Sequence, residues 1–155
     1  MRDGVGEGLH VFAAVLKCLT VKREFRFQGV SAAACRAAGY DLVIVETPGI
    51  GQGDAAIAPH ASVSLYVMTP DYGAASQLEK IEMLDVADAV AVNKFERRGG
   101  EDALRDVARQ LVRNREAFGT PWQRMPVFGT SAARFADDGV TALYHHLKSL
   151  LVERG

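Results

Sequence analysis

The sequence has little cysteine, little net charge and no long apolar run, and each shortage excludes a class of protein. Cys18 and Cys35 form no CxxC pair, which argues against a disulfide framework or a zinc site and fits a reducing, cytoplasmic compartment. The formal net charge is −1 with acids and bases mixed, so we expect neither a nucleic acid nor a membrane surface as partner. The apolar run 10–21 is too short and interrupted to span a bilayer, and no signal peptide is predicted.

Strand and helix patterns alternate from residue 31 onwards. At 155 residues, one domain with a buried core is expected. The unbroken apolar run 42–45 is typical of a strand buried on both faces of a parallel sheet. The alternation predicts an α/β fold with a mostly parallel sheet. The predicted elements are a helix from 31 closed by Gly39, strands at 42–45 and 63–69, a helix at 74–87, a strand at 89–93, a helix with an apolar stripe at 104–112 behind Glu101 and Asp102, a strand at 125–130, and a helix beginning at Asp137 or Asp138.

The two ends of the chain differ in how well they fit this pattern. Residues 1–26 fit poorly; the stretch 21–27 alternates charge and bulk like an edge strand, but the pattern gives it no place. In the last helix, His145 and His146 are interpreted as a surface pair. One face of that helix carries Val140, Leu143, Tyr144, Leu147, Leu150 and Leu151.

Polar residues follow three of the predicted strands. In open α/β sheets, ligands bind beyond the carboxyl ends of the strands. Glu46 with Gly49, Asn93 with Lys94, and Thr130 with Ser131 stand at such ends. A simpler interpretation stays open at this point: Glu46 caps a turn, and the glycines that follow form only a tight loop.

Two enzyme classes fit these strand ends poorly. A dinucleotide fold needs GxGxxG, but the loop has Gly49, Gly51 and Gly53 followed by Asp54 where the last glycine belongs.

A serine hydrolase is the other class. The sequence GTSAA at 129–133 loosely resembles the nucleophile elbow GxSxG around Ser131. The acids and histidines that a triad needs lie within fifteen residues, largely on one predicted helix, and could not easily converge on the serine. They are Asp137, Asp138, His145 and His146.

The sequence NKFE at 93–96 resembles the NKxD guanine-recognition motif of GTPases. A carboxylate accepts hydrogen bonds from two neighbouring N–H groups of guanine, a pair that adenine lacks. The lysine stem can cover the face of the base. A later strand ends in TSA at 130–132, and an acid-glycine turn at 46–49 precedes both in the expected order.

With these three motifs in order, the chain resembles the MeaB/ArgK-like metallochaperone GTPases that serve cobalamin-dependent acyl-CoA mutases, and among them the GTPase domain of fused isobutyryl-CoA mutases. The resemblance covers roughly residues 30–150. It implies a three-layer P-loop-NTPase-like fold that binds GTP or GDP with Mg²⁺. It also implies an acyl-CoA mutase as partner. GTP hydrolysis would gate the loading of adenosylcobalamin onto that mutase, and this chain would not itself bind adenosylcobalamin. The stretches that carry it are YDLVIVETPGIGQGDAAI, SLYVMTPDYGAASQLEKIEMLD, NKFERRGGEDALRDV and FGTSAARF.

The resemblance also implies roles for single residues. Glu46 and Gly49 would form a catalytic switch turn, with Glu46 near Mg²⁺ or its water. Gln52, Gln77 and Lys80 would couple nucleotide state to the mutase, although 71–80 also fits a solvated helix start. The residues implied to hold guanine are Asn93, Lys94, Glu96, Ser131 and Ala132.

Two features depart from the family pattern. Glu96 stands where the motif usually has Asp, which moves the carboxylate outward by one methylene. The chain also has no GxxxxGK[ST]; the segment 4–10 has glycines but no Lys-Ser/Thr pair.

The missing loop changes the expected activity. We interpret residues 1–29 as a poorly matched segment and 30–155 as the C-terminal portion of a GTPase domain, a truncated fragment that alone hydrolyses no GTP at a useful rate. The loss of a central strand would leave an exposed sheet edge and favour self-association. The alternative is a non-catalytic interaction module that docks on a mutase or on a second copy of itself.

Overall fold

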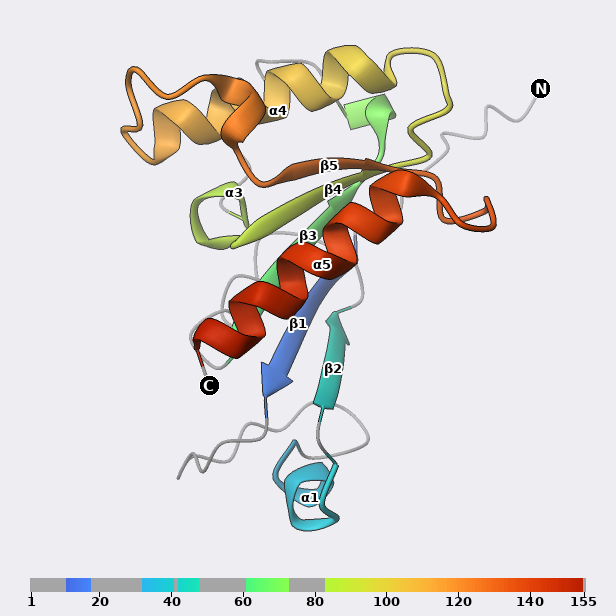
Figure 1. Ribbon diagram of the computed structural model, residues 1–155, viewed down its shortest axis with the longest axis vertical. Helices are drawn as coiled ribbons and strands as arrows, with labels where there is room; N and C mark the ends of the chain where they lie inside the picture. The colour runs from blue at the N-terminus through green and yellow to red at the C-terminus, as the bar shows by residue number, and fades with distance from the viewer. Residues whose placement is uncertain (1–10, 18–31, 41, 48–60, 73–82, 155) are drawn as a thin grey trace, which may run out of the picture.

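The residues that the structure describes are arranged around one five-stranded sheet. A computed structural model describes residues 11–17, 32–40, 42–47, 61–72 and 83–154 (Figure 1). The strand order is β2-β1-β3-β4-β5. The strands are β1 (Val11–Lys17), β2 (Leu42–Thr47), β3 (Val63–Met68), β4 (Ala89–Asn93) and β5 (Val127–Thr130). The helices are α1 (Ala32–Ala37), α3 (Met83–Val86), α4 (Gly100–Asn114) and α5 (Asp138–Glu153), with 3-10 turns η2 (Pro70–Tyr72) and η3 (Trp122–Arg124).

Four of the five strands run in the same direction. The pairs β3–β4 and β4–β5 are parallel. β1 is antiparallel to both β2 and β3, so β2 points the same way as β3. The predicted α/β fold is therefore confirmed, and the carboxyl ends of β2, β3, β4 and β5 lie along one edge of the sheet.

β1 corrects the expectation for the N-terminal segment. Residues 11–17 lie inside the sheet, where Val15 is paired with Ile44 on one side and Val63 on the other. The sequence pattern gives this apolar run no place in the sheet, because a short run does not reveal its pairing partners. The two outermost strands of the sheet are β2 and β5. The predicted edge strand at 21–27 lies outside the described residues.

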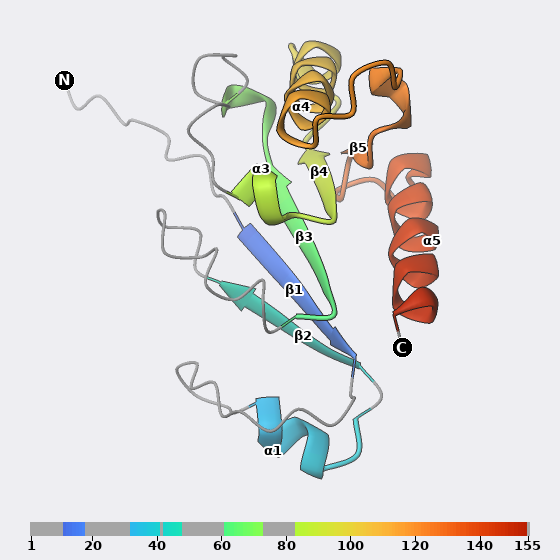
Figure 2. The same cartoon turned by 90° about the vertical axis from the view of Figure 1, so that its left-hand side faces the viewer.

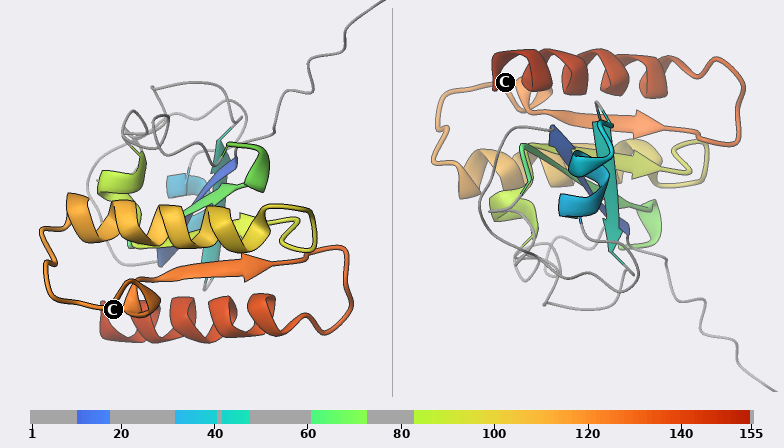
Figure 3. Two further views of the ribbon diagram at one scale, coloured as in Figure 1. Left: turned by 90° about the horizontal axis from the view of Figure 1, so that it is seen from above. Right: turned by 90° about the horizontal axis from the view of Figure 1, so that it is seen from below.

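Helices cover the two faces of β3, β4 and β5. α4 lies on one face and α5 on the other, with β5 between them (Figure 3). On the α4 face, Tyr66 and Val90 pack with residues of α3 and α4 such as Leu84 and Leu111. On the α5 face, the small side chains of Ala89 and Ala91 pack with Leu143. β3 and β4 are thus buried on both faces, which explains their continuous apolar sequences.

β2 does not follow the predicted pattern of burial. Its side chains at Leu42 and Ile44 are 46% and 64% exposed, whereas Val45 packs at the margin of the α4-side core. The reason is its position: β2 is outermost, and α5 lies over β5 and away from β2 (Figure 2). The expectation that 42–45 is buried on both faces of a parallel sheet is therefore wrong, and its described partner is antiparallel.

The apolar stripe of α5 is only partly buried. Leu143 is buried, while Val140 and Tyr144 are 40% and 59% exposed. His145 is exposed, but His146 is partly buried and its ring lies 5.3 Å from that of Phe128. The interpretation of these histidines as a surface pair is therefore wrong for His146, because that position turns toward β5.

Most other predicted elements are confirmed. Gly39 follows α1 with φ of +80°, as expected just past a helix. β4 has the predicted bounds, and the first turn of α4 carries Glu101 and Asp102. β5 begins at Val127 and not at 125, because η3 extends to Arg124.

Part of the predicted helix 74–87 lies outside the described residues, which contain only its last turn as α3. None of the described helices has both the length and the apolar character needed to cross a bilayer.

Candidate functional site

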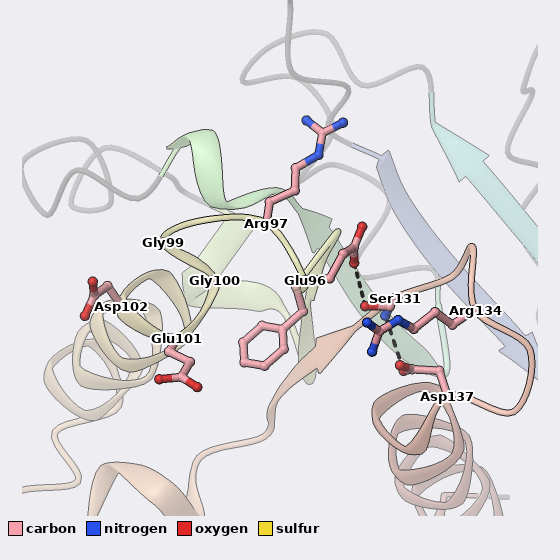
Figure 4. A pocket seen from close by; sticks show the side chains of 10 residues that line it. Glu96, Arg97, Gly99, Gly100, Glu101, Asp102, Ser131, Arg134 and Asp137 are labelled. Carbon is pink, nitrogen blue, oxygen red and sulfur yellow. Dashed lines mark hydrogen bonds between the residues drawn. The ribbon is translucent and has the colours of Figure 1, made fainter.

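A pocket of about 520 Å³ lies at the carboxyl ends of β4 and β5 (Figure 4). The loop after β4, the start of α4 and the turn between β5 and α5 form its walls. This is the edge of the sheet where ligands bind in open α/β folds. The residues that line it are Phe95, Glu96, Arg97, Gly99, Gly100, Glu101, Asp102, Ser131, Arg134 and Asp137.

A short hydrogen bond joins the two predicted guanine motifs. Oγ of Ser131 donates to Oε2 of Glu96 at 2.6 Å, which connects the loop after β4 to the end of β5 (Figure 4). This bond, together with the backbone N–H of Glu96 and the nearby Arg134 and Arg97, lowers the pKa of the Glu96 carboxyl despite a small opposing effect of desolvation. The pocket therefore presents an ionised, exposed carboxylate near neutral pH.

Asn93, at the end of β4, also connects the loop after β4 to the turn after β5. Its Oδ1 accepts hydrogen bonds from the backbone N–H of Ala132 at 3.2 Å and from Oγ1 of Thr130 at 3.4 Å. The N–H of Phe95 donates to the carbonyl of Thr130 at 3.1 Å. Asn93 therefore fixes the turn after β5 relative to the loop that carries Glu96.

Asp137 supports the pocket from the start of α5. Its Oδ1 accepts from the N–H of Val140 at 2.9 Å, which caps the helix, and from the N–H of Ser131 at 3.2 Å. These donors lower the pKa of the Asp137 carboxyl. The sequence predicted that α5 begins here, but it did not predict that the cap also holds Ser131 in place.

Phe95 explains two glycines to which the sequence motifs assign no role. A Cβ atom on Gly129 would lie 2.5 Å from the Phe95 ring, and one on Gly100 would lie 2.2 Å from the Phe95 carbonyl oxygen. Both positions therefore require glycine for the loop to approach β5 and α4 this closely. Lys94 has φ of 57°, in the left-handed region, which turns the chain sharply after β4. The available signal was the pair Gly99 and Gly100 shortly after NKFE and Gly129 directly before TSA.

The structure brings part of the predicted site together. Asn93, Glu96, Ser131 and Ala132 form one hydrogen-bonded unit, with Lys94 in the same loop. Glu46 lies at the end of β2, exposed, three strands from β4, which is roughly 14 Å at the usual strand spacing. The remaining predicted residues, Gly49, Gln52, Gln77 and Lys80, lie outside the described residues.

The structure provides no support for hydrolase or metal chemistry within its described part. Ser131 bonds to Glu96, and His146 packs on Phe128, so these residues do not form a serine triad. The described residues contain no group of three or more acidic, histidine or cysteine side chains that could hold a metal ion. A magnesium ion needs only one or two protein carboxylates beside phosphates and water, so a role for Glu46 stays a prediction.

Comparison with known proteins identifies the family. The sequence model of the family "Methylmalonyl Co-A mutase-associated GTPase MeaB" matches residues 28–152, which is most of the chain. The chain belongs to the MeaB family. The match contains every described residue of the pocket, and the P-loop GTPase fold of this family agrees with the observed α/β sheet.

Several named proteins are similar to this MeaB-family chain. The fused isobutyryl-CoA mutases of Nocardia farcinica and Cupriavidus metallidurans are 76% and 66% identical to it, each over 123 residues or 79% of this chain. The GTPase ArgK of Escherichia coli is 39% identical over 62 residues, which are 39% of this chain and 18% of ArgK. The chain spans only 12% and 11% of the length of the two mutases.

Proposed function

We propose that residues 30–155 are the base-binding portion of a MeaB-type GTPase domain and that the pocket holds the guanine of GTP or GDP. The observation that supports this most is the Glu96 carboxylate held by Ser131 at 2.6 Å. An ionised carboxylate in this position accepts the two neighbouring N–H donors of guanine, and adenine cannot supply that pair. Asn93, Lys94 and Ala132 complete the base site.

The phosphates and their metal ion would need groups beyond this pocket. The chain contains no GxxxxGK[ST], the loop that gives backbone N–H groups, a lysine and a Mg²⁺-binding hydroxyl to the phosphates. We therefore propose that this chain alone hydrolyses no GTP at a useful rate. Glu46 and Gly49 would form the switch turn, with Glu46 near Mg²⁺ or its water. Gln52, Gln77 and Lys80 would couple the nucleotide state to a partner.

The partner in this proposal is an acyl-CoA mutase. Support comes from relatives named fused isobutyryl-CoA mutase, which are up to 76% identical to this chain. In the intact system, GTP hydrolysis would gate the loading of adenosylcobalamin onto the mutase, and the cobalamin would not bind to this chain.

A nucleotide titration tests the base site. The full chain is titrated with fluorescent methylanthraniloyl GDP and ADP, and phosphate release from GTP is followed. We expect weak binding that prefers GDP, no phosphate release, and loss of the preference in Glu96→Ala. Glu101→Ala is the matched control, because Glu101 is an exposed acid of the same pocket without a recorded bond to Ser131 among the described residues.

Two results would contradict the proposal. Micromolar GTP binding with measurable phosphate release by the unmodified chain would overturn the claim of inactivity. Glu96→Ala is also tested in a chain supplied with a GxxxxGK[ST] segment, where phosphate binding raises the overall affinity. If nucleotide binding there does not change, the guanine assignment is wrong.

A second candidate function is a non-catalytic interaction module. The exposed apolar side chains of β2, Leu42 and Ile44, favour it, because contiguous exposed apolar surface marks interaction sites. Such a module would self-associate or dock on a mutase without nucleotide. Light scattering of the chain and of Ile44→Lys, with and without GDP, tests it. A monomer at all concentrations that also binds no mutase domain would exclude this function.

A further inference from the structure

A second pocket lies at the opposite end of the sheet from the nucleotide site. It has a volume of about 650 Å³, within the range of small-molecule sites, and we call it the rear pocket. Its walls come from α3, the amino ends of β4 and β5, the residues after α4, and the last turns of α5. In Figure 1, α3 and the C-terminal end of α5 lie on the side where β4 and β5 begin. Its polar side chains are Asp85, Asp88, Arg115, Gln123, Arg124, His146 and Arg154.

The polar floor of the rear pocket is firmly built. Oδ2 of Asp88 accepts hydrogen bonds from the N–H and Oγ of Ser64 at 2.8 and 2.9 Å, and Oδ1 pairs with Arg154 at 2.5 Å. Arg154 also donates to the carbonyl of Ser62 at 2.8 Å. Burial alone would raise the pKa of Asp88, but its bonds to Arg154 and Ser64 outweigh burial and lower the pKa. Asp88 and Arg154 therefore satisfy each other and give the pocket a fixed base.

Three other polar side chains of the rear pocket are not satisfied in this way. Nε2 of His146 is buried and has no hydrogen-bond partner among the described residues. A buried polar atom without a partner costs about 1–3 kcal/mol, and natural proteins keep few of them without a reason. Arg124 is exposed, and no ion pair is recorded for it within the described part of the chain. Arg115 donates to the carbonyl of Ala87 at 2.7 Å. Like Arg124, it forms no ion pair with a carboxylate of the described residues.

Charge and apolar lining together define what the rear pocket fits. Three arginines face two aspartates there, which gives a net charge of +1 with His146 neutral. A ligand with one negative charge neutralises this net charge, whereas a phosphate dianion carries one negative charge too many. Planar guanidinium groups bind carboxylates with two parallel hydrogen bonds. The rest of the lining is largely apolar and includes Val86, Met125, Phe128 and Leu150.

We propose that the rear pocket binds a monocarboxylate that carries an apolar body. Arg124 holds the carboxylate, Nε2 of His146 donates a second hydrogen bond to it, and the apolar body lies against Met125, Phe128 and Leu150. The carboxylate belongs either to a free small acid or to a glutamate or aspartate side chain of a polypeptide. This site is independent of the proposed guanine site, because the two pockets share no lining residue.

NMR titrations of the isotope-labelled full chain test this proposal. The probes are sodium benzoate for a free acid, the blocked peptide acetyl-Leu-Glu-Leu-amide for a polypeptide carboxylate, and sodium phosphate and chloride at matched ionic strength. We expect saturable shifts at residues of the rear pocket with benzoate or with the peptide, and the tighter of the two identifies the source. Arg124→Gln should weaken binding about tenfold, the loss of one charge-assisted hydrogen bond.

Two further variants make the test specific. His146→Phe keeps an aromatic ring against Phe128 and removes the nitrogen, so binding should weaken about two- to tenfold while thermal stability stays equal or rises. Arg109→Gln, an exposed arginine of α4 outside the rear pocket, should bind as the parent does. Binding that is unchanged in both Arg124→Gln and His146→Phe overturns the proposal. So do phosphate binding tighter than benzoate binding, or no binding of either carboxylate.

Discussion

At the residue scale, one carboxylate determines how the nucleotide pocket is organised. The motif usually has Asp at position 96, and the longer Glu96 side chain reaches across to Oγ of Ser131. Ser131 is in turn held by Asp137 through its backbone N–H, and Ala132 by Asn93. The extra methylene therefore lets Glu96 join two loops, and this bond helps to shape the pocket.

Removing the Ser131 hydroxyl should change the acidity of Glu96. The hydrogen bond from Ser131 favours the charged carboxylate and is the largest influence on its pKa. We therefore expect Ser131→Ala to raise the pKa of Glu96 toward its ordinary value. Carbon-13 NMR titration of the glutamate carboxyl groups measures this, with the parent chain as reference. An unchanged Glu96 pKa would show that the bond does not persist in solution.

At the element scale, polar side chains fix the ends of elements whose positions packing alone would leave free. Asp88 lies between α3 and β4, yet it binds Ser64 at the start of β3 and Arg154 just past α5. The C-terminal end of α5 is thereby attached to the amino ends of two strands. Apolar packing by Leu143 positions the middle of the same helix.

Acid should loosen this attachment. The folded-state pKa of Asp88 is lowered, so its contribution to the free energy of unfolding is present above its unfolded pKa of about 3.9 and is lost as pH falls through the folded value. We expect Asp88→Asn to cost about 1–3 kcal/mol at neutral pH. Urea unfolding at several pH values should show the parent and the variant converging below pH 4. A constant difference at all pH values would contradict this role.

The elements also show what the sequence could and could not predict. β4 and α4 were predictable because their apolar periodicity and first-turn acids are local signals. The burial of β2 was not, because four consecutive apolar residues look alike in a central and in an outermost strand. Glu96 and Ser131 could be placed together from their motifs, but the fit of Phe95 against Gly129 depends on backbone proximity that no spacing encodes.

At the scale of the whole molecule, the antiparallel β1 holds the two parts of the sheet together. β2 and β3 point the same way but are not neighbours. β1 lies between them and pairs with β2 on one side and with β3 on the other. Without β1, β2 and α1 would have no described connection through the sheet to β3, β4 and β5. The residues that line the pockets at both ends of β4 and β5 lie between 85 and 154, and neither strand is adjacent to β1 in the described sheet.

A proline in β1 should therefore affect the two parts of the molecule differently. Val15 is paired with both Ile44 and Val63, and proline at this position removes a backbone donor from a central strand. We expect Val15→Pro to cost at least about 1–3 kcal/mol from the unpaired carbonyl and to speed amide hydrogen exchange in β2 and β3. α4, β5 and α5 should keep most of their protection, because β4 and β5 pair with each other and with β3, and neither is adjacent to β1 in the described sheet. Val15→Thr, which keeps the amide N–H and the branched side chain, is the matched control. If both variants exchange alike, β1 does not hold the sheet together; if Val15→Pro exposes α4 and α5 as fully as β2, the molecule unfolds as a single unit.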